Sequence, residues 1–129
     1  MSHFSYLKFF RSFRYAIRGL TRLIATEQNA RVHFVATIIV GLAAYFFQLS
    51  RLEAVVLFFA VVLVFAIEII NTAIEKLLDL VHPESHSQIA FIKDALAGAV
   101  LITAAIAFVV GTLIFYPHLK ELFYTVVLL

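Results

Sequence analysis

Three long apolar segments constrain this chain more than any other feature of its sequence. They cover residues 32–49, 54–74 and 95–116, and the third contains no charged residue. A helix of about 22 residues is roughly 33 Å long, which is enough to cross a hydrocarbon core of about 30 Å. Because backbone amides inside lipid must be satisfied within their own segment, each stretch is predicted to be a transmembrane helix.

The composition supports a single membrane domain. Of the 129 residues, 64% are hydrophobic and only 14% are charged, whereas about a quarter of the residues in a soluble domain are charged. There is no cysteine, which excludes disulfides and thiol nucleophiles. We therefore expect one domain over residues 1–129, an all-α membrane protein with an amphipathic helix ahead of three spans.

Residues 2–26 have the pattern of a helix that lies in the membrane interface. On a helical wheel, its apolar face carries Tyr6, Phe10, Phe13, Ile17, Leu20 and Ile24. Its opposite face carries Lys8, Arg11, Arg14, Arg18 and Arg22. The alternative is a soluble amphipathic helix that packs on a partner domain. Because basic flanks stay inside, the N-terminus is predicted to be cytoplasmic.

A column of polar side chains marks the cytoplasmic half of the second span. It consists of Glu68, Asn71, Glu75 and Asp79, which are three, four and four residues apart and share one helix face within about 80°. A carboxylate inside a span costs at least about 2.5 kcal/mol on insertion scales, so Glu68 requires partners or a wet cavity. The alternative is that Glu68 pairs with an arginine and only holds helices together.

Glu27 and Asp94 are expected at the same cytoplasmic interface, beside the start of the first and third spans. Clustered carboxylates repel one another unless a cation neutralises them, and oxygen ligands without cysteine suit Mg²⁺. Lys93 and arginines could balance phosphate charge. The chain has four glycines and no glycine-rich phosphate loop. The residues alone therefore predict an acidic, metal-binding site at the interface, without identifying a nucleotide.

Two motifs give the chain a family resemblance: Glu68-x-x-Asn71-Thr-Ala-Ile-Glu75-x-x-x-Asp79 and Lys93-Asp94-x-x-Ala97-Gly98-Ala99-Val100. With Glu27-x-Asn29, they resemble the small bacterial integral membrane diacylglycerol kinases and the related undecaprenol kinases, over roughly residues 10–115. The resemblance implies a homotrimer that transfers the γ-phosphate of ATP, bound with Mg²⁺, to a lipid hydroxyl, and no nucleic-acid partner.

The resemblance also implies a role for each site residue. Glu68 corresponds to the general base, and Asn71 to a residue that orients the reacting groups. Glu27 and Glu75 correspond to metal ligands. The nucleotide-binding positions are Asp79, Lys93 and Asp94, with a phosphate contact from either Arg11 or Arg14.

The sequence leaves alternatives open for the lipid substrate and for the class of function. The stretch from Glu27 to His33 resembles the undecaprenol kinase branch, although His33 could equally be an ordinary residue at a helix end. A small transporter or ion relay could also use Glu68. A relay requires polar groups through the whole membrane depth, and the outer halves of these spans offer almost none. A structural anchor that recruits a partner through its basic helix leaves the Glu68 column unexplained.

Overall fold

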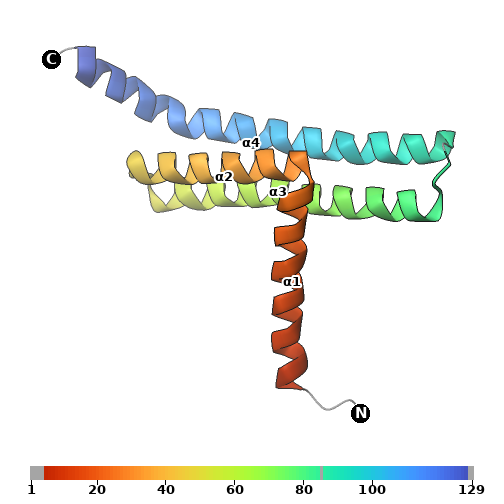
Figure 1. Cartoon of the computed structure of the whole chain (residues 1–129). Helices are drawn as coiled ribbons and strands as arrows, with labels where there is room; N and C mark the ends of the chain where they lie inside the picture. Colours follow the sequence, from red (N-terminus) through yellow and green to blue (C-terminus); the bar gives the residue numbers. More distant parts are fainter. Residues whose placement is uncertain (1–4, 85, 128–129) are drawn as a thin grey trace.

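The computed structural model describes residues 5–84 and 86–127. The regular elements in these ranges are four α-helices: α1 (Tyr6–Thr26), α2 (Gln28–Phe46), α3 (Arg51–Val81) and α4 (Ser87–Val127). In Figure 1, α2, α3 and α4 run alongside one another as a bundle, and α1 projects away from it. The predicted all-α class is confirmed, and α2, α3 and α4 are each long and apolar enough to cross a membrane.

The helices α3 and α4 extend beyond both ends of the predicted spans, whereas α2 both begins and ends earlier than predicted. The helix α2 covers residues 28–46 where 32–49 was predicted, α3 covers 51–81 in place of 54–74, and α4 covers 87–127 in place of 95–116. Hydropathy detects the segment that can lie in lipid, but a helix continues into water until a cap or a breaker ends it. Between α3 and α4, residues 82–84 are not helical and the chain bends at Glu84; Ser85 lies outside the described residues.

The connection between α2 and α3 has the predicted length but lies three residues earlier, at residues 47–50 in place of 50–53. Residues 51–53 were expected between the first two spans, but they form the first turn of α3 because Ser50 caps it. The Glu53 backbone N–H donates to Ser50 Oγ (3.4 Å), and the Ser50 backbone N–H donates to Glu53 Oε2 (2.8 Å). This capping box satisfies amides that would otherwise lack partners, so the helix begins directly after the turn.

The C-terminal tail continues α4 to Val127 and is not a separate segment; Leu128 and Leu129 lie outside the described residues. Pro117 lies inside this helix. Proline lacks a backbone N–H and its ring crowds the preceding turn, which bends helices. Figure 1 shows the last part of α4 diverging from α3. Next to Pro117, the His118 ring lies 3.2 Å from Glu53 Oε1, which ties α4 to the start of α3.

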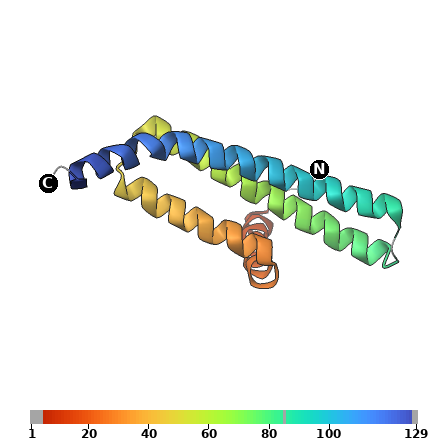
Figure 2. The same cartoon turned by 90° about the horizontal axis from the view of Figure 1, so that it is seen from above.

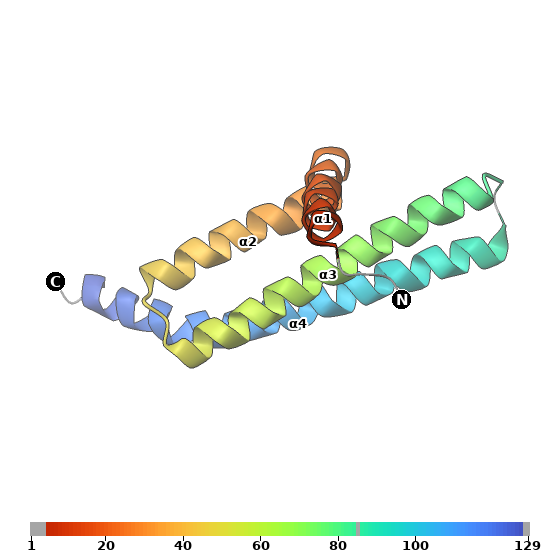
Figure 3. The ribbon, with the colours of Figure 1, turned by 90° about the horizontal axis from the view of Figure 1, so that it is seen from below.

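The helix α1 crosses the direction of the bundle. Figures 2 and 3, which are viewed at right angles to Figure 1, show α1 nearly end-on while the other three helices are seen lengthwise. The described part of the predicted interfacial helix is therefore oriented as a helix in the membrane plane would be if the bundle spans the bilayer. On that basis, the junction of α1 and α2 marks the level of one membrane surface.

The buried interior of the described chain is small and half polar. Its buried apolar residues are Ala30, Leu57 and Val64, and its buried polar residues are Glu68, Asn71 and Thr72. Most of the large apolar side chains are exposed. Soluble domains bury apolar residues and expose charged ones. The reverse arrangement here is that of a chain whose apolar surface faces lipid or other protomers.

Candidate functional site

The centre of the site is a buried polar cluster on one face of α3. Glu68 is 2% exposed, Asn71 is 5% exposed and Thr72 is 4% exposed. Among the described residues, Glu68 Oε2 and Asn71 Oδ1 are buried without any hydrogen-bond partner. Leaving a buried acceptor unsatisfied costs about 1–3 kcal/mol, and more for a charged group. Both atoms are oxygens, so the group that would satisfy them is a hydrogen-bond donor or a cation.

The fold brings other ionisable groups close to this cluster. The electrostatic neighbours of the Glu68 carboxylate are His33 on α2, Glu75 on α3, and Glu27 at the junction of α1 and α2. Glu27 and Glu75 therefore lie near enough to Glu68 within one chain to act on its carboxylate electrostatically. Thr72, one turn along α3 from Glu68, is also a neighbour of that carboxylate.

Glu27 occupies the break between α1 and α2. Its backbone is extended (φ −104°, ψ 127°), so α1 ends before it and α2 begins after it. Glu27 Oε1 lies 2.8 Å from Lys76 Nζ and accepts a hydrogen bond from Thr26 Oγ1 at 3.0 Å. These two contacts, Lys76 first, hold the pKa of the Glu27 carboxyl below its ordinary value. The Glu27 carboxylate is therefore ionised and already paired with the Lys76 ammonium.

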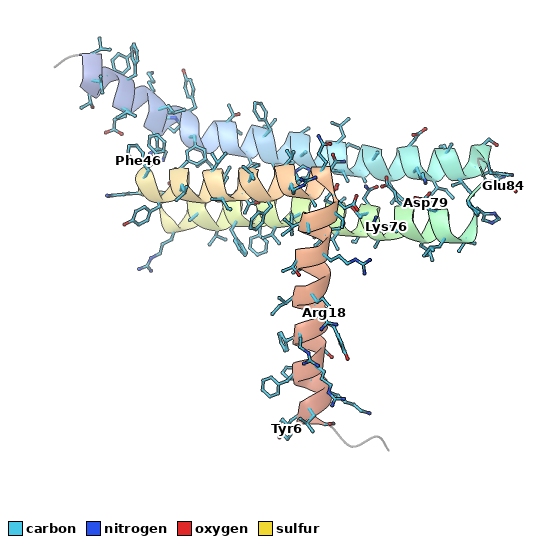
Figure 4. All side chains as sticks on the ribbon, viewed as in Figure 1. Tyr6, Arg18, Phe46, Lys76, Asp79 and Glu84 are labelled. Atoms are coloured by element: carbon cyan, nitrogen blue, oxygen red, sulfur yellow. The ribbon has the colours of Figure 1, made fainter. Side chains whose placement is uncertain are left out.

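Asp79 and Lys93 form an ion pair between α3 and α4. Figure 4 shows Asp79 beyond Lys76 on α3, on the way to Glu84 at the tip of the bundle and past the level at which α1 departs. These two predicted nucleotide-binding residues thus lie together, on the part of the bundle that extends past the interfacial helix. Asp94 follows Lys93 and is exposed; within the described ranges its side chain forms no hydrogen bond or ion pair.

The two arginines predicted to contact phosphate are not brought to these residues by their own chain. Arg11 and Arg14 are exposed on α1. In Figure 4, α1 leads from the bundle past Arg18 to Tyr6 at its far end, and both arginines lie between those two positions in the sequence. Their side chains therefore lie on the projecting helix, away from the Asp79–Lys93 pair.

Two cavities lie between the helices, and one of them is lined in part by Thr72 of the cluster. An apolar groove of about 480 Å³ lies between α2, α3 and α4, and His33 and Thr37 are among its few polar lining residues. A cleft of about 710 Å³ lies between α1 and α3, and it is lined by apolar side chains together with Arg22, Thr26, Thr72 and Lys76.

Lys76 and Thr72 are the site residues that were not predicted. Both share a helical face with Glu68, at successive spacings of four residues, and that spacing was available as a signal. The partner of Lys76, Glu27, is far away in the sequence, so their contact could not be predicted. As for metal ligands, residues 5–84 and 86–127 contain no group of three or more histidine, aspartate or glutamate side chains positioned around one point.

Comparisons with known proteins identify the family. The family described as prokaryotic diacylglycerol kinase matches residues 14–115. The undecaprenol kinase of Bacillus subtilis (strain 168) is 38% identical over 112 residues, which cover 87% of this chain and 91% of that protein. A diacylglycerol kinase of Synechocystis is also 38% identical over 112 residues, which cover 86% of this chain and 64% of that protein. The Escherichia coli (strain K12) diacylglycerol kinase is 29% identical over 104 residues, which cover 81% of this chain and 85% of that protein.

The family match covers most of the chain and includes the whole α3 column and Lys93 and Asp94. Membership favours phosphotransfer over an ion relay or a structural anchor as the role of the buried carboxylate. The chain is therefore a lipid kinase that belongs to the prokaryotic diacylglycerol kinase family.

Proposed function

We propose that Glu68 is the general base of this lipid kinase. The observation that carries the proposal is the buried Glu68 Oε2, which has no partner in the described chain and lies near the equally unpartnered Asn71 Oδ1. A lipid hydroxyl is a donor that would complete either atom. As its oxygen bonds to the γ-phosphorus of ATP, the bond to the ADP oxygen breaks, and Glu68 accepts the hydroxyl proton. Asn71 orients the hydroxyl.

Glu27 and Glu75 are proposed as ligands of Mg²⁺, which would neutralise charge on the transferring phosphate. The donor set supports this assignment. Both groups are carboxylates near Glu68, and Glu27 already binds the Lys76 ammonium at 2.8 Å. Magnesium usually takes only one or two carboxylates from the protein and keeps water and phosphate oxygens as its other ligands. Two glutamates from one chain therefore suffice.

Asp79, Lys93 and Asp94 are proposed to bind ATP. They lie at the end of the bundle where α3 and α4 extend past α1, which is where a water-soluble nucleotide would arrive. The Lys93 ammonium is a single point charge suited to phosphate. The basic face of α1 supports a cytoplasmic location for this end, because arginine and lysine are retained on the cytoplasmic side.

A homotrimer is proposed because one protomer leaves most of its apolar side chains exposed and its buried central carboxylate with one oxygen that lacks a hydrogen-bond partner in the described chain. Three spans alone form a thin bundle. A neighbouring protomer would cover apolar surface, and it could bring the basic face of α1, with Arg11 or Arg14, toward the nucleotide of another chain.

The proposed lipid is undecaprenol or diacylglycerol, with undecaprenol first. The Bacillus subtilis relative that is named an undecaprenol kinase matches 87% of this chain, although the similarly related Synechocystis protein is named a diacylglycerol kinase. The groove of about 480 Å³ is mostly apolar and suits a hydrocarbon chain, and His33 on its wall is an electrostatic neighbour of Glu68.

A two-lipid assay tests this function. The purified protein is incubated in mixed micelles with ATP, Mg²⁺, and either undecaprenol or diacylglycerol at the same mole fraction. We expect phosphate on at least one lipid, with faster transfer to undecaprenol, and none with Glu68→Gln, which controls for a contaminating kinase. Absence of phosphate on both lipids would refute the proposal, and faster transfer to diacylglycerol would reverse the order of the substrates.

A further inference from the structure

Lys76 is a cation held on a carboxylate that is proposed to bind a metal. Its Nζ lies 2.8 Å from Glu27 Oε1, the oxygen that also accepts from Thr26 Oγ1 at 3.0 Å. Lys76 and Thr26 both use lone pairs of this oxygen, so a magnesium ion on it would compete with the ammonium and would also be repelled by its positive charge. The two cations therefore compete for Glu27 Oε1.

We propose that Lys76 is a tethered cation that competes with the divalent metal for Glu27 and holds this carboxylate in place until the metal displaces it. This inference rests on the metal role proposed above for Glu27. Lys76 acts on the reaction through Glu27 and is a positioning residue.

The exposure of the pair makes this exchange feasible. The Lys76 side chain is 59% exposed and that of Glu27 is 28% exposed. Exposed ion pairs contribute little to stability, because water screens the charges and two flexible side chains must be ordered. A divalent ion with twice the charge therefore displaces the ammonium at small cost. A deeply buried pair would instead hold the site closed.

The displaced ammonium has space to enter. Lys76 lines the cleft of about 710 Å³ between α1 and α3, whose wall also carries the Thr72 and Thr26 side chains and, as a like charge, Arg22. Because the Lys76 side chain is 59% exposed, its ammonium can remain in water at the mouth of this cleft. A lysine side chain can reorient into this cleft by changing rotamers, without any movement of α3. The exchange therefore requires no rearrangement of the bundle.

The test measures metal binding directly, without ATP or lipid. Mn²⁺ is added to the purified full-length protein in detergent, and electron paramagnetic resonance counts the free ion. We expect K76M to lower the Kd for Mn²⁺ by about two- to fivefold, the range set by the strength of an exposed pair. The charge-preserving K76R should retain the wild-type Kd. If K76M does not fold, K76Q carries the same expectation.

Two controls locate the effect at Glu27. K120M removes a lysine from the far end of α4, where Lys120 Nζ lies 5.9 Å from the centre of the Tyr124 ring, and should leave the Kd unchanged. In an E27Q background, K76M should no longer tighten binding. An unchanged or raised Kd in K76M, the same gain in the E27Q background, or no Mn²⁺ binding by the wild type would overturn the proposal. If the protein phosphorylates lipid but K76M does not lower the Kd for Mn²⁺, only the role of Lys76 is refuted. If K76M lowers that Kd but the protein phosphorylates no lipid, only the proposed function is refuted.

Discussion

Replacing Glu68 by glutamine is expected to change catalysis and stability in opposite directions. Glutamine has nearly the same shape, so the packing around this 2% exposed side chain is preserved. The amide, however, cannot accept a proton from an attacking hydroxyl. If Glu68 had a purely structural role, its replacement would instead lower the stability of the protein, because the groups that contact it would lose a charged partner.

The expected magnitudes follow from burial. Loss of a general base lowers rates roughly 100- to 10,000-fold, which corresponds to about 3–5 kcal/mol in the activation barrier. A charge inside a span costs at least about 2.5 kcal/mol, and Glu68 Oε2 has no compensating partner among the described residues. Because a neutral amide avoids most of that cost, we expect Glu68→Gln to stabilise the protein by about 1–2 kcal/mol.

Both quantities are measured on the same preparation. Initial rates of lipid phosphorylation in mixed micelles give the catalytic loss, and loss of helix on titration with sodium dodecyl sulfate gives the free energy of unfolding. Substitution of the exposed Glu84 by glutamine serves as the matched control and should change neither. A Glu68→Gln protein with normal rates would remove Glu68 from the base role. A protein that loses both rate and stability would assign Glu68 to structure.

Three further predictions concern other parts of the site and fold. Asp79→Asn and Lys93→Met should each raise the KM for ATP about tenfold through loss of a charged contact. The Asp79 and Lys93 side chains are 64% and 34% exposed, so a double-mutant cycle should give a coupling below about 1 kcal/mol in the free energy of unfolding. A larger coupling would assign the pair a structural role. Lys76→Met should raise the pKa of the Glu27 carboxyl toward its ordinary value of 4.5, measured by ¹³C NMR. Because that pKa is depressed in the folded chain, the Glu27–Lys76 pair contributes to stability above pH 4.5, and this contribution is lost as the pH falls through the folded pKa. An unchanged Glu27 pKa in Lys76→Met would contradict the contact between the two side chains. Ser50→Ala should lower the unfolding free energy by about 1 kcal/mol through loss of the α3 cap, with kcat unchanged for the folded fraction.

The helix ends show what hydropathy can predict. The apolar segment 54–74 predicted a helix, and the helix is there, but it runs from Arg51 to Val81. Its first turn depends on a local capping box that the residues Ser50 and Glu53 could have indicated. Its last turns lie beyond the lipid-like segment, where hydropathy carries no information about whether a helix continues.

The sequence by itself determined that this chain has three membrane-spanning segments, an amphipathic N-terminal helix, and a polar column on one face of α3. These features follow from periodicity and composition, which are local along the chain. Only the tertiary structure decided that Glu27 contacts Lys76, that Asp79 pairs with Lys93, and that a single chain leaves Arg11 and Arg14 away from both pairs. Such contacts depend on how separate helices pack. The residue pattern of one helix does not specify which side chains of another helix will contact it.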